Sequence, residues 1–239
     1  MKKITFLFPL YNEEKRISIL SNFLKWIKKN KITRYEILLV SNGSTDKTKE
    51  KIYQYQKNYS FIKSFHVPFK SRGKAVKLAI KKSKYNLIAV CAIDNAWDLN
   101  FYKEAYKLLN ITKYSVIFGP KTHYKSKVRR PRLRKIISLI SSTFLKLMFG
   151  EVIDQDTQCV KVFKKGDIFF KKLLSDSNFF SDVEFFLFTK LFKLKYLSIP
   201  VNVKDNKGKV SLIMMFSFVL NAIKFKFSKN YKIGAKYYS

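Results

Sequence analysis

The sequence predicts one α/β domain built around a mostly parallel β-sheet. The chain has 239 residues, of which 47% are hydrophobic, and this is enough for one full core. Short apolar runs alternate with segments of helical spacing through the first half of the chain. The links between them are short, and strands that alternate with helices in this way favour a parallel sheet.

The first elements follow from their apolar patterns. Ile4–Leu10 is a continuous apolar run, which is typical of a strand buried on both faces. Residues 13–29 carry apolar side chains at helical spacing and predict a helix. A second strand is expected at 35–40, where it runs into the polar turn 41–44. Thr45 and Asp46 then supply the residue types that begin helices. Expected after them are a helix at 47–57, a strand at 61–67, a helix at 73–83, a strand at 87–93, a helix at 99–109 and a strand at 115–119.

Polar clusters stand directly after three of these strands, at Tyr11–Glu13, Ser41–Gly43 and Asp94–Asn95. In open parallel sheets, ligands bind outside the carboxyl ends of the strands. We therefore expect these clusters to line a binding site.

The second half of the chain has a different character. Residues 125–135 are strongly basic, and residues 136–149 form an apolar stretch that is too short to span a bilayer. The segment 211–227 mixes large apolar residues with lysine. We expect amphipathic helices that associate with a membrane surface, and we divide the chain into a domain at 1–210 and a basic amphipathic tail at 211–239.

The net charge of +33 predicts an anionic partner, such as anionic lipid, nucleic acid or a phosphorylated substrate. A lysine-rich codon bias is an alternative, but it leaves unexplained why Glu occurs only seven times. No nucleic-acid-binding module is visible, so we expect no nucleic acid. Cys91 and Cys159 both lie in apolar segments, which indicates free thiols in a reducing compartment. His66 and His123 are far apart, which argues against a His/Cys metal site.

Residues 156–163, with the sequence Asp-Thr-Gln-Cys-Val-Lys-Val-Phe, form the most informative segment. Four of the 16 acidic residues lie in or near this segment and the one that follows it, at Asp154, Asp156, Asp182 and Glu184. The alternation in residues 160–163 predicts a strand with one buried face. Taken by itself, the segment also fits a polar turn that enters a strand.

Together with Asp-Val-Glu at 182–184, this segment resembles the acceptor-side signature of dolichyl-phosphate β-glucosyltransferases, a branch of the family 2 glycosyltransferases. The resemblance covers about residues 4–212 and implies a Rossmann-like GT-A fold. It implies an inverting transfer of sugar from a nucleotide-diphosphate donor such as UDP-glucose to a polyprenyl or dolichyl phosphate. The enzyme would then be peripheral on the cytoplasmic face of a membrane. The catalytic residues implied are Asp156, Gln158 and Asp94, with Asp182 and Glu184 supporting the site by pairing with an Arg cluster.

The donor half of the resemblance lies near the N-terminus. Residues 8–14 resemble the family's P-x-Y-N-E-E turn, and residues 40–46 resemble its V-D-D-G-S-x-D segment. Lys74 follows Gly73 at a helix start, where a phosphate binds favourably. The donor-binding residues implied are Pro9, Tyr11, Asn12, Glu13, Asn42, Gly43, Lys74 and Asp94.

The acidic pattern of the family is incomplete in this chain. Ser41 and Asn42 stand where the family usually has acidic residues, and Ala92 replaces the first Asp of the D-x-D motif. Asp94 then takes the place of the second Asp, and Asp98 is a candidate helper. We expect a divalent cation, Mg²⁺ or Mn²⁺, that is held weakly by one carboxylate together with water and substrate oxygens.

Arginine is concentrated in one place. The chain has seven Arg against 42 Lys, and four of the seven lie at 129–134. Arg forms bidentate hydrogen bonds with phosphate, which Lys cannot form. Arg130 and Arg134 match the family's R-x-x-x-R segment, and Lys121 is a weaker candidate contact for the acceptor phosphate. A solvated basic loop followed by a core helix is the alternative.

Three other functions remain open at this stage. The acceptor could be another cell-envelope glycan. Because Ser41, Asn42 and Ala92 are neutral, the chain could also be a degenerate, non-catalytic domain that binds membranes. The net charge is the only feature that favours a nucleic-acid binder.

Overall fold

The computed structural model describes residues 3–93, 98–178, 180–204 and 212–238. Its strands are β1 Ile4–Leu10, β2 Tyr35–Asn42, β3 Ile62–Val67, β4 Leu87–Val90, β5 Val116–Gly119, β6 Lys127–Arg129, β7 Val160–Lys164, β8 Tyr196–Ser198 and β9 Asn202–Lys204. Its helices are α1 Leu20–Lys29, α2 Thr48–Asn58, α3 Arg72–Lys82, α4 Leu99–Ile111, α5 Arg132–Phe149, α6 Ser181–Leu191, α7 Leu212–Lys226 and α8 Lys229–Tyr238. Within these described ranges, seven strands form one central sheet and β6 and β9 form a second, two-stranded sheet.

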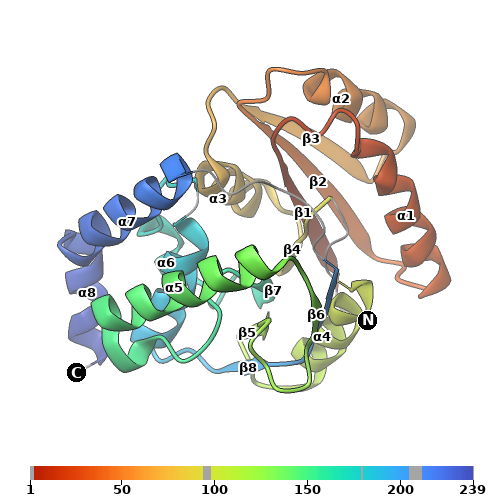
Figure 1. The fold of residues 1–239 in the computed structure, drawn as a ribbon. Coiled ribbons are helices and arrows are strands. Elements are labelled where there is room, and N and C mark those ends of the chain that lie inside the picture. Colours follow the sequence, from red (N-terminus) through yellow and green to blue (C-terminus); the bar gives the residue numbers. More distant parts are fainter. Residues whose placement is uncertain (1–2, 94–97, 179, 205–211, 239) are drawn as a thin grey trace.

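The central sheet has the strand order β3-β2-β1-β4-β7-β5-β8 (Figure 1). The pairs of β1 with β2 and β4, of β2 with β3, and of β5 with β8 are parallel. The strand β7 is antiparallel to both of its neighbours, β4 and β5. The predicted α/β class with a mostly parallel sheet is therefore confirmed, with one reversed strand that the β-α alternation does not reveal.

The reversal of β7 determines what meets at one edge of the sheet. In the ladder, Lys161 near the start of β7 pairs with Val90 at the end of β4, and Val160 pairs with Gly119 at the end of β5. The segment before β7 therefore lies at the same edge as the carboxyl ends of β1, β2, β4 and β5. This is the edge at which ligands bind in open α/β sheets.

Two hydrophobic layers enclose the sheet. On one face, α3, α5, α6 and α7 pack against side chains such as Leu7, Ile88 and Phe163. On the other face, α1, α2 and α4 pack against side chains such as Phe6 and Ile117. The two groups of helices lie on opposite sides of the sheet in Figure 1.

The strand at 4–10 is confirmed at both ends, whereas other boundaries differ from prediction. The helix expected at 13–29 begins later, with a 3-10 turn at Ile17–Ile19 followed by α1. The strand expected at 87–93 ends at Val90. The apolar stretch at 136–149 is the larger part of α5, which begins earlier, at Arg132.

The expectation that residues 160–163 have one buried face is wrong. All four of these residues are buried, including Lys161, which is only 2% exposed. Val162 faces the layer of α4, and Phe163 faces the layer of α6. A central strand covered by helices on both faces is buried throughout, so the alternation in residue type does not report exposure here.

The C-terminal helices pack on α6. Phe218, Ala222 and Phe225 of α7 are buried in the same core as α6, and Gly234 of α8 lies against Leu191 and Phe188. The division of the chain into 1–210 and 211–239 stays a prediction. Among the described residues, no helix has both the length and the hydropathy that crossing a bilayer requires.

Candidate active site at the carboxyl edge of the sheet

The turns that follow β1 and β2 interlock. The backbone N–H of Thr45 donates to Asn12 Oδ1 over 2.9 Å, and Asn12 Nδ2 donates to Thr45 Oγ1 over 3.2 Å. Asn12 has a φ of 53°, a conformation that Asn adopts more readily than most residues. Glu13 accepts a two-pronged hydrogen bond from Arg16, with distances of 2.6 and 2.8 Å. The predicted donor residues Asn12 and Glu13 are thus held rigidly at this edge.

Ser41 and Asn42 end β2 as buried polar residues. Asn42 Nδ2 donates to the carbonyl of Leu10 over 2.8 Å. Asn42 Oδ1 and Ser41 Oγ are buried without a hydrogen-bond partner among the described residues. A buried polar atom without a partner costs about 1–3 kcal/mol, so such atoms in a native fold call for an explanation, such as a bound water or ligand.

Gly43 allows a second segment to approach this turn. Its φ is 68°, and a Cβ at this position would overlap the backbone nitrogen of Lys70. The nearby Lys70 ammonium lies 3.9 Å from the centre of the Tyr11 ring. Pro9, the remaining predicted donor residue of β1, is half-buried and pairs with Val40 in the ladder.

The first turn of α3 is already satisfied by the protein itself. Ser71 caps the helix and accepts from the N–H of Lys74 over 3.0 Å. The N–H groups of Arg72 and Gly73 donate to Asn178 Oδ1 and to the carbonyl of Ser177. The helix start therefore does not offer these N–H groups to a phosphate, and a role for Lys74 depends on its side chain.

Asp156 and Lys121 form an ion pair before β7. Lys121 Nζ lies 2.8 Å from Asp156 Oδ2, and the two side chains are 18% and 15% exposed. Lys121 Nζ also donates to the carbonyl of Gln158, whose own N–H donates to Asp156 Oδ1. The structure thus brings together Asp156, Gln158 and Lys121, which the sequence assigns to the two separate tasks of catalysis and acceptor binding.

The predicted phosphate contacts Arg130 and Arg134 lie at the start of α5. Arg130 Nη2 donates to the carbonyl of Arg134 and to Ser138 Oγ, both over 2.8 Å. Its Nε is buried and has no hydrogen-bond partner within the described part of the chain. The Arg130 guanidinium is therefore held along the first turns of the helix with donor capacity left over.

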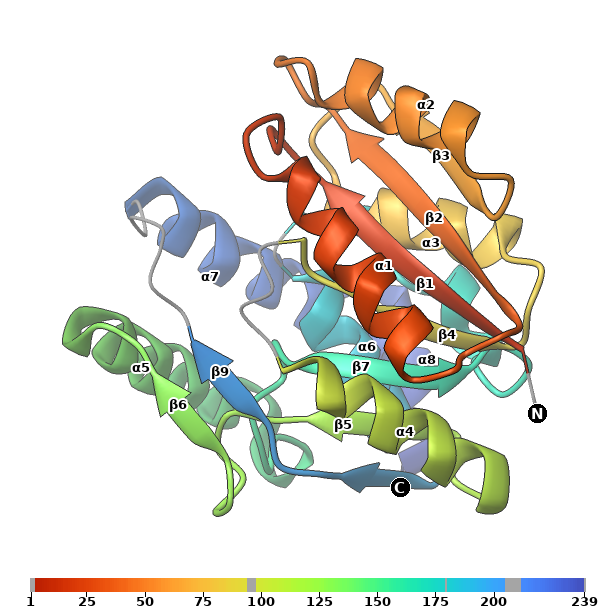
Figure 2. The ribbon, with the colours of Figure 1, turned by 90° about the vertical axis from the view of Figure 1, so that its right-hand side faces the viewer.

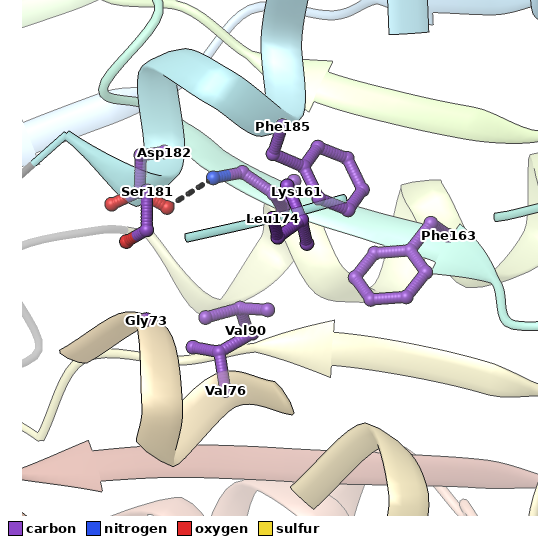
Figure 3. A pocket seen from close by; sticks show the side chains of 9 residues that line it. All are labelled: Gly73, Val76, Val90, Lys161, Phe163, Leu174, Ser181, Asp182 and Phe185. Atoms are coloured by element: carbon purple, nitrogen blue, oxygen red, sulfur yellow. Dashed lines mark hydrogen bonds and ion pairs between the residues drawn. The ribbon is translucent and has the colours of Figure 1, made fainter. Parts of the chain in front are cut away.

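Asp182 pairs with Lys161 and Arg72 rather than with the Arg cluster, so that part of the prediction is wrong. Its carboxylate accepts from Arg72 Nε over 3.0 Å and forms an ion pair with the Lys161 ammonium. Asp182 and Lys161 lie at a small cavity of about 10 Å³ (Figure 3). The cavity is lined by Gly73, Val76, Val90, Lys161, Phe163, Leu174, Ser181, Asp182 and Phe185.

The two predicted supporting carboxylates have opposite electrostatic environments. Burial acts to raise the pKa of Asp182, but the charges of Arg72 and Lys161 outweigh it and hold the pKa well below its usual range. Burial raises the pKa of Glu184, although it accepts hydrogen bonds from the Ser175 N–H and hydroxyl. The anionic form of Asp182 is thus stabilised in the fold, whereas burial disfavours the anionic form of Glu184.

Arg72 and Lys161 were missed as candidate site residues. One signal was available for each of them. Arg72 is one of three Arg outside the 129–134 cluster in a chain that otherwise uses Lys, and Lys161 interrupts an apolar strand.

The predicted metal ligand Asp94 lies outside the described residues. Asp98, the candidate helper, caps α4 through the N–H of Asn100 and accepts from Asn202 Nδ2. In the ranges that the structure describes, no group of three or more His, Cys, Asp or Glu side chains could hold a metal ion.

Curated relatives of this chain include dolichyl-phosphate beta-glucosyltransferases. The Trichomonas vaginalis enzyme ALG5A is 30% identical over 166 residues, covering 65% of this chain and 51% of that protein. The human enzyme is 26% identical over 224 residues, covering 87% of this chain and 69% of that protein. The chain spans about half the length of the Trichomonas relatives that it matches.

Among solved structures, glucosyl-3-phosphoglycerate synthase from Mycobacterium tuberculosis is similar in fold. Its complex with Mn²⁺, UDP and glucosyl-3-phosphoglycerate aligns with a TM-score of 0.64 at 13% sequence identity, covering 94% of this chain and 80% of that one. Its complex with Mn²⁺, UDP-glucose and phosphoglyceric acid aligns with a TM-score of 0.66 at 12% identity, covering 94% and 79%. These neighbours support the GT-A-like fold.

The family model of glycosyl transferase family 2 matches residues 5–170, which is well over half of the 239-residue chain. The match begins in β1 and extends beyond β7. It thus includes both the interlocked turns after β1 and β2 and the Asp156–Lys121 pair. The chain therefore belongs to glycosyl transferase family 2.

Proposed function

We propose that this chain transfers a sugar, with inversion, from a nucleoside-diphosphate sugar to a polyprenyl phosphate at the cytoplasmic face of a membrane. The observation that carries the proposal is the reversal of β7, which lies between β4 and β5. It brings the Asp156 segment to the carboxyl edge, where Asn12 and Asn42 also lie. One edge of the sheet then has polar groups for a donor and polar groups for an acceptor.

The donor is assigned to the turns after β1 and β2. The unpartnered Asn42 Oδ1 can accept a hydrogen bond from a ribose hydroxyl or from a base N–H. Asn12 and Glu13 hold the turn in shape, and Gly43 admits the segment that carries Lys70. Pro9 and Tyr11 complete this wall, and the Lys74 ammonium supplies positive charge for the diphosphate. UDP-glucose is our first choice of donor because of the dolichyl-phosphate glucosyltransferase relatives.

In the proposed reaction, an oxygen of the lipid phosphate attacks the anomeric carbon of the sugar. A new carbon–oxygen bond forms, the bond to the nucleoside diphosphate breaks, and the diphosphate leaves with the electron pair. A lipid phosphate is already anionic near neutral pH, so it needs little help from a general base. Catalysis then depends on the positioning of the reactants and on stabilisation of the leaving group.

The acceptor phosphate is assigned to Arg130, Arg134 and Lys121. Asp156 and Gln158 orient the acceptor and the sugar hydroxyls. The ion pair of Lys121 with Asp156 supports this assignment, because it holds an anion and a cation side by side at the edge of the sheet. We assign Asp182 and Glu184 to the support of the site from beneath.

A divalent cation, Mg²⁺ or Mn²⁺, is assigned to Asp94, with the donor diphosphate supplying further oxygens. Such an ion, when bound, would neutralise the charge of the leaving diphosphate. Ser41, Asn42 and Ala92 add no carboxylate, so we expect weak metal binding in the absence of the nucleotide.

A thermal-shift screen followed by a transfer assay tests the proposal. UDP-glucose, other nucleotide sugars and free UDP are added to the protein with and without Mg²⁺ or Mn²⁺. A ligand at 100 times its Kd stabilises the fold by about 2.7 kcal/mol. The transfer of labelled sugar to a short polyprenyl phosphate then identifies the acceptor. If no nucleotide sugar stabilises the protein at millimolar concentration, the donor site is refuted. If the donor binds but only a glycan accepts sugar, the lipid-phosphate acceptor is refuted.

A further inference from the structure

Helix α5 presents an apolar face to solvent. Leu133, Ile136, Ile140 and Leu147 follow one another at helical spacing and are all exposed, with Leu147 82% and Leu133 67% exposed. A helix at the surface of a globular domain normally has polar residues on its outward face. The outward face of α5 is therefore not explained by the folding of this domain.

Helix α7 has the same unusual arrangement. Phe216, Leu220 and Ile223 of α7 and Phe227, which follows its last residue, are spaced four, three and four residues apart, and all are exposed. The opposite face of α7 is the one that packs on the core. Both faces of this helix are thus apolar, although only one of them is needed for packing.

The two helices lie next to each other on the outside of the molecule. They contact one another, and both lie in front of α6 in Figure 1. Figure 2, turned by 90°, places them on the side toward which the carboxyl ends of β1 and β2 point. The two helices therefore lie on the same side of the molecule as the carboxyl ends of β1 and β2, where the candidate active site lies.

The apolar faces are accompanied by positive charge. Arg132, Lys135 and Lys146 of α5 and Lys224 of α7 are exposed, and neither helix contains Asp or Glu. Long basic side chains can lay their apolar stems along such a surface while their charges reach anionic head groups.

We propose that the outward faces of α5 and α7 form one docking surface for an anionic lipid bilayer, here called the α5–α7 face. A second copy of the chain fits this face poorly, because a self-complementary contact would bring the same lysines together in a protein of net charge +33. An anionic bilayer matches both the apolar area and the charge.

This inference rests on the proposed function, since an enzyme that uses a lipid phosphate must reach it at the membrane surface. It adds an orientation to that function. Because α5 begins at Arg132, two residues after Arg130, docking of the α5–α7 face holds the Arg cluster at the level of the head groups. The acceptor phosphate then meets Arg130 and Arg134 without leaving the membrane surface.

Co-sedimentation of the full chain with vesicles tests the α5–α7 face. The vesicles are phosphatidylcholine with or without phosphatidylserine. We expect Ile136→Ser with Ile140→Ser, and separately Phe216→Ser with Phe227→Ser, to weaken binding at least tenfold. Ile111→Ser is the matched control, because Ile111 is 80% exposed on α4, away from this face. Circular dichroism spectra and melting temperatures confirm that each variant is folded.

A second pair of variants tests the charge. Lys135→Gln and Lys224→Gln should each weaken binding to anionic vesicles about fivefold, since one basic residue near such a surface contributes about 1 kcal/mol. Lys28→Gln and Lys29→Gln on α1 are the controls.

The proposal is overturned if wild type binds both kinds of vesicle equally, or if the serine variants bind as wild type does. It is also overturned if those variants abolish a dimer seen without vesicles. The thermal shift with nucleotide sugar is independent of all these results, so failure of docking and failure of the proposed function can be told apart.

Discussion

The ammonium of Lys161 is almost entirely buried, and Asp182 neutralises it from the first turn of α6. Arg72 at the start of α3 shares the same carboxylate over 3.0 Å. Three elements, β7, α6 and α3, thus share one partly buried carboxylate. Lys161 is only three residues after Gln158 in the sequence. These ion pairs therefore also hold in place the start of β7, which lies next to the candidate site.

Replacement of Asp182 by Asn should destabilise the fold by about 3–5 kcal/mol, because it leaves the Lys161 charge buried without a counter-charge. Urea unfolding measures the change. Lys161→Met should cost less, because Asp182 keeps Arg72 as its partner. Adding Lys161→Met to Asp182→Asn should recover part of the loss. If the double variant is no more stable than Asp182→Asn, the buried charge is not the cause.

The same carboxylate predicts a dependence on pH. The pKa of Asp182 is lower in the folded protein than its ordinary value of 3.8, so its contribution to stability is present above that value. The contribution is lost as the pH falls through the lowered, folded-state pKa. The difference in free energy of unfolding between wild type and Asp182→Asn should therefore be constant near neutral pH and shrink below about pH 4. A difference that is the same at pH 7 and pH 3 would contradict this account.

Arg130→Lys and Arg134→Lys should each lower acceptor-dependent turnover about 10- to 150-fold, although the charge is kept. Loss of one charge-assisted hydrogen bond is worth about 1.5–3 kcal/mol, and Lys does not have the planar fork of Arg. Transfer kinetics with a short polyprenyl phosphate measure the effect, and nucleotide-sugar affinity should stay unchanged. Arg129→Lys is the control, because Arg129 is an exposed member of the same cluster. Normal transfer by both variants would make the cluster only a membrane-facing or solvated patch.

Gly43→Ala should reduce both stability and nucleotide-sugar affinity, whereas Gly150→Ala should reduce stability alone. The two glycines have φ angles of 68° and 67°, which favour glycine, so each substitution carries a backbone penalty of about 1–3 kcal/mol. A Cβ at Gly43 would also overlap the backbone of Lys70, whereas a Cβ at Gly150 would have no atom within 4 Å. Melting temperatures with and without UDP separate the two effects. A thermal shift with UDP that is the same in Gly43→Ala as in wild type would show that close approach at Gly43 does not matter for the nucleotide.

Cys91 and Cys159 should react slowly with thiol reagents in the folded protein. Both are free and buried, and burial raises the pKa of Cys159 to about 12 and raises that of Cys91 further. The thiolate is the reactive form, so little is present at neutral pH. Labelling with a chromogenic disulfide should be slow in buffer and complete in urea. Fast labelling of either thiol under native conditions would show that its segment opens readily.

Prediction from sequence was most successful where one local pattern decides the structure. The run Ile4–Leu10 is apolar throughout, and its strand has the predicted bounds. The direction of a strand in the sheet cannot be predicted in this way, because its residue pattern is the same whether the strand is parallel or antiparallel. The reversal of β7 depends on its pairing with β4 and β5. The end of β4 at Val90 likewise depends on pairing, since Cys91 to Ile93 continue largely apolar.

The candidate site shows the same division. The interlocked turn at Asn12 and Thr45 and the cluster around Asp156 lie where polar residues follow or precede strands, so their place was predictable. The pairing of Asp182 was not, because its partners Arg72 and Lys161 are 110 and 21 residues away in sequence. That the first N–H groups of α3 are already hydrogen-bonded could not be predicted for the same reason, since their acceptors are residues 177 and 178.

The reversed strand β7 also separates the donor-binding part of the sequence from the acceptor-binding part. The groups that we assign to the donor all come before residue 95, and those assigned to the acceptor phosphate all come after residue 119. In the central sheet, the two groups are joined through the ladder between β4 and β7. A transplanted segment that preserves this ladder and the Lys161–Asp182 contact could bring a different acceptor to the same nucleotide. Proteins that descend from such a fold can therefore change their acceptor while keeping the same nucleotide-sugar donor.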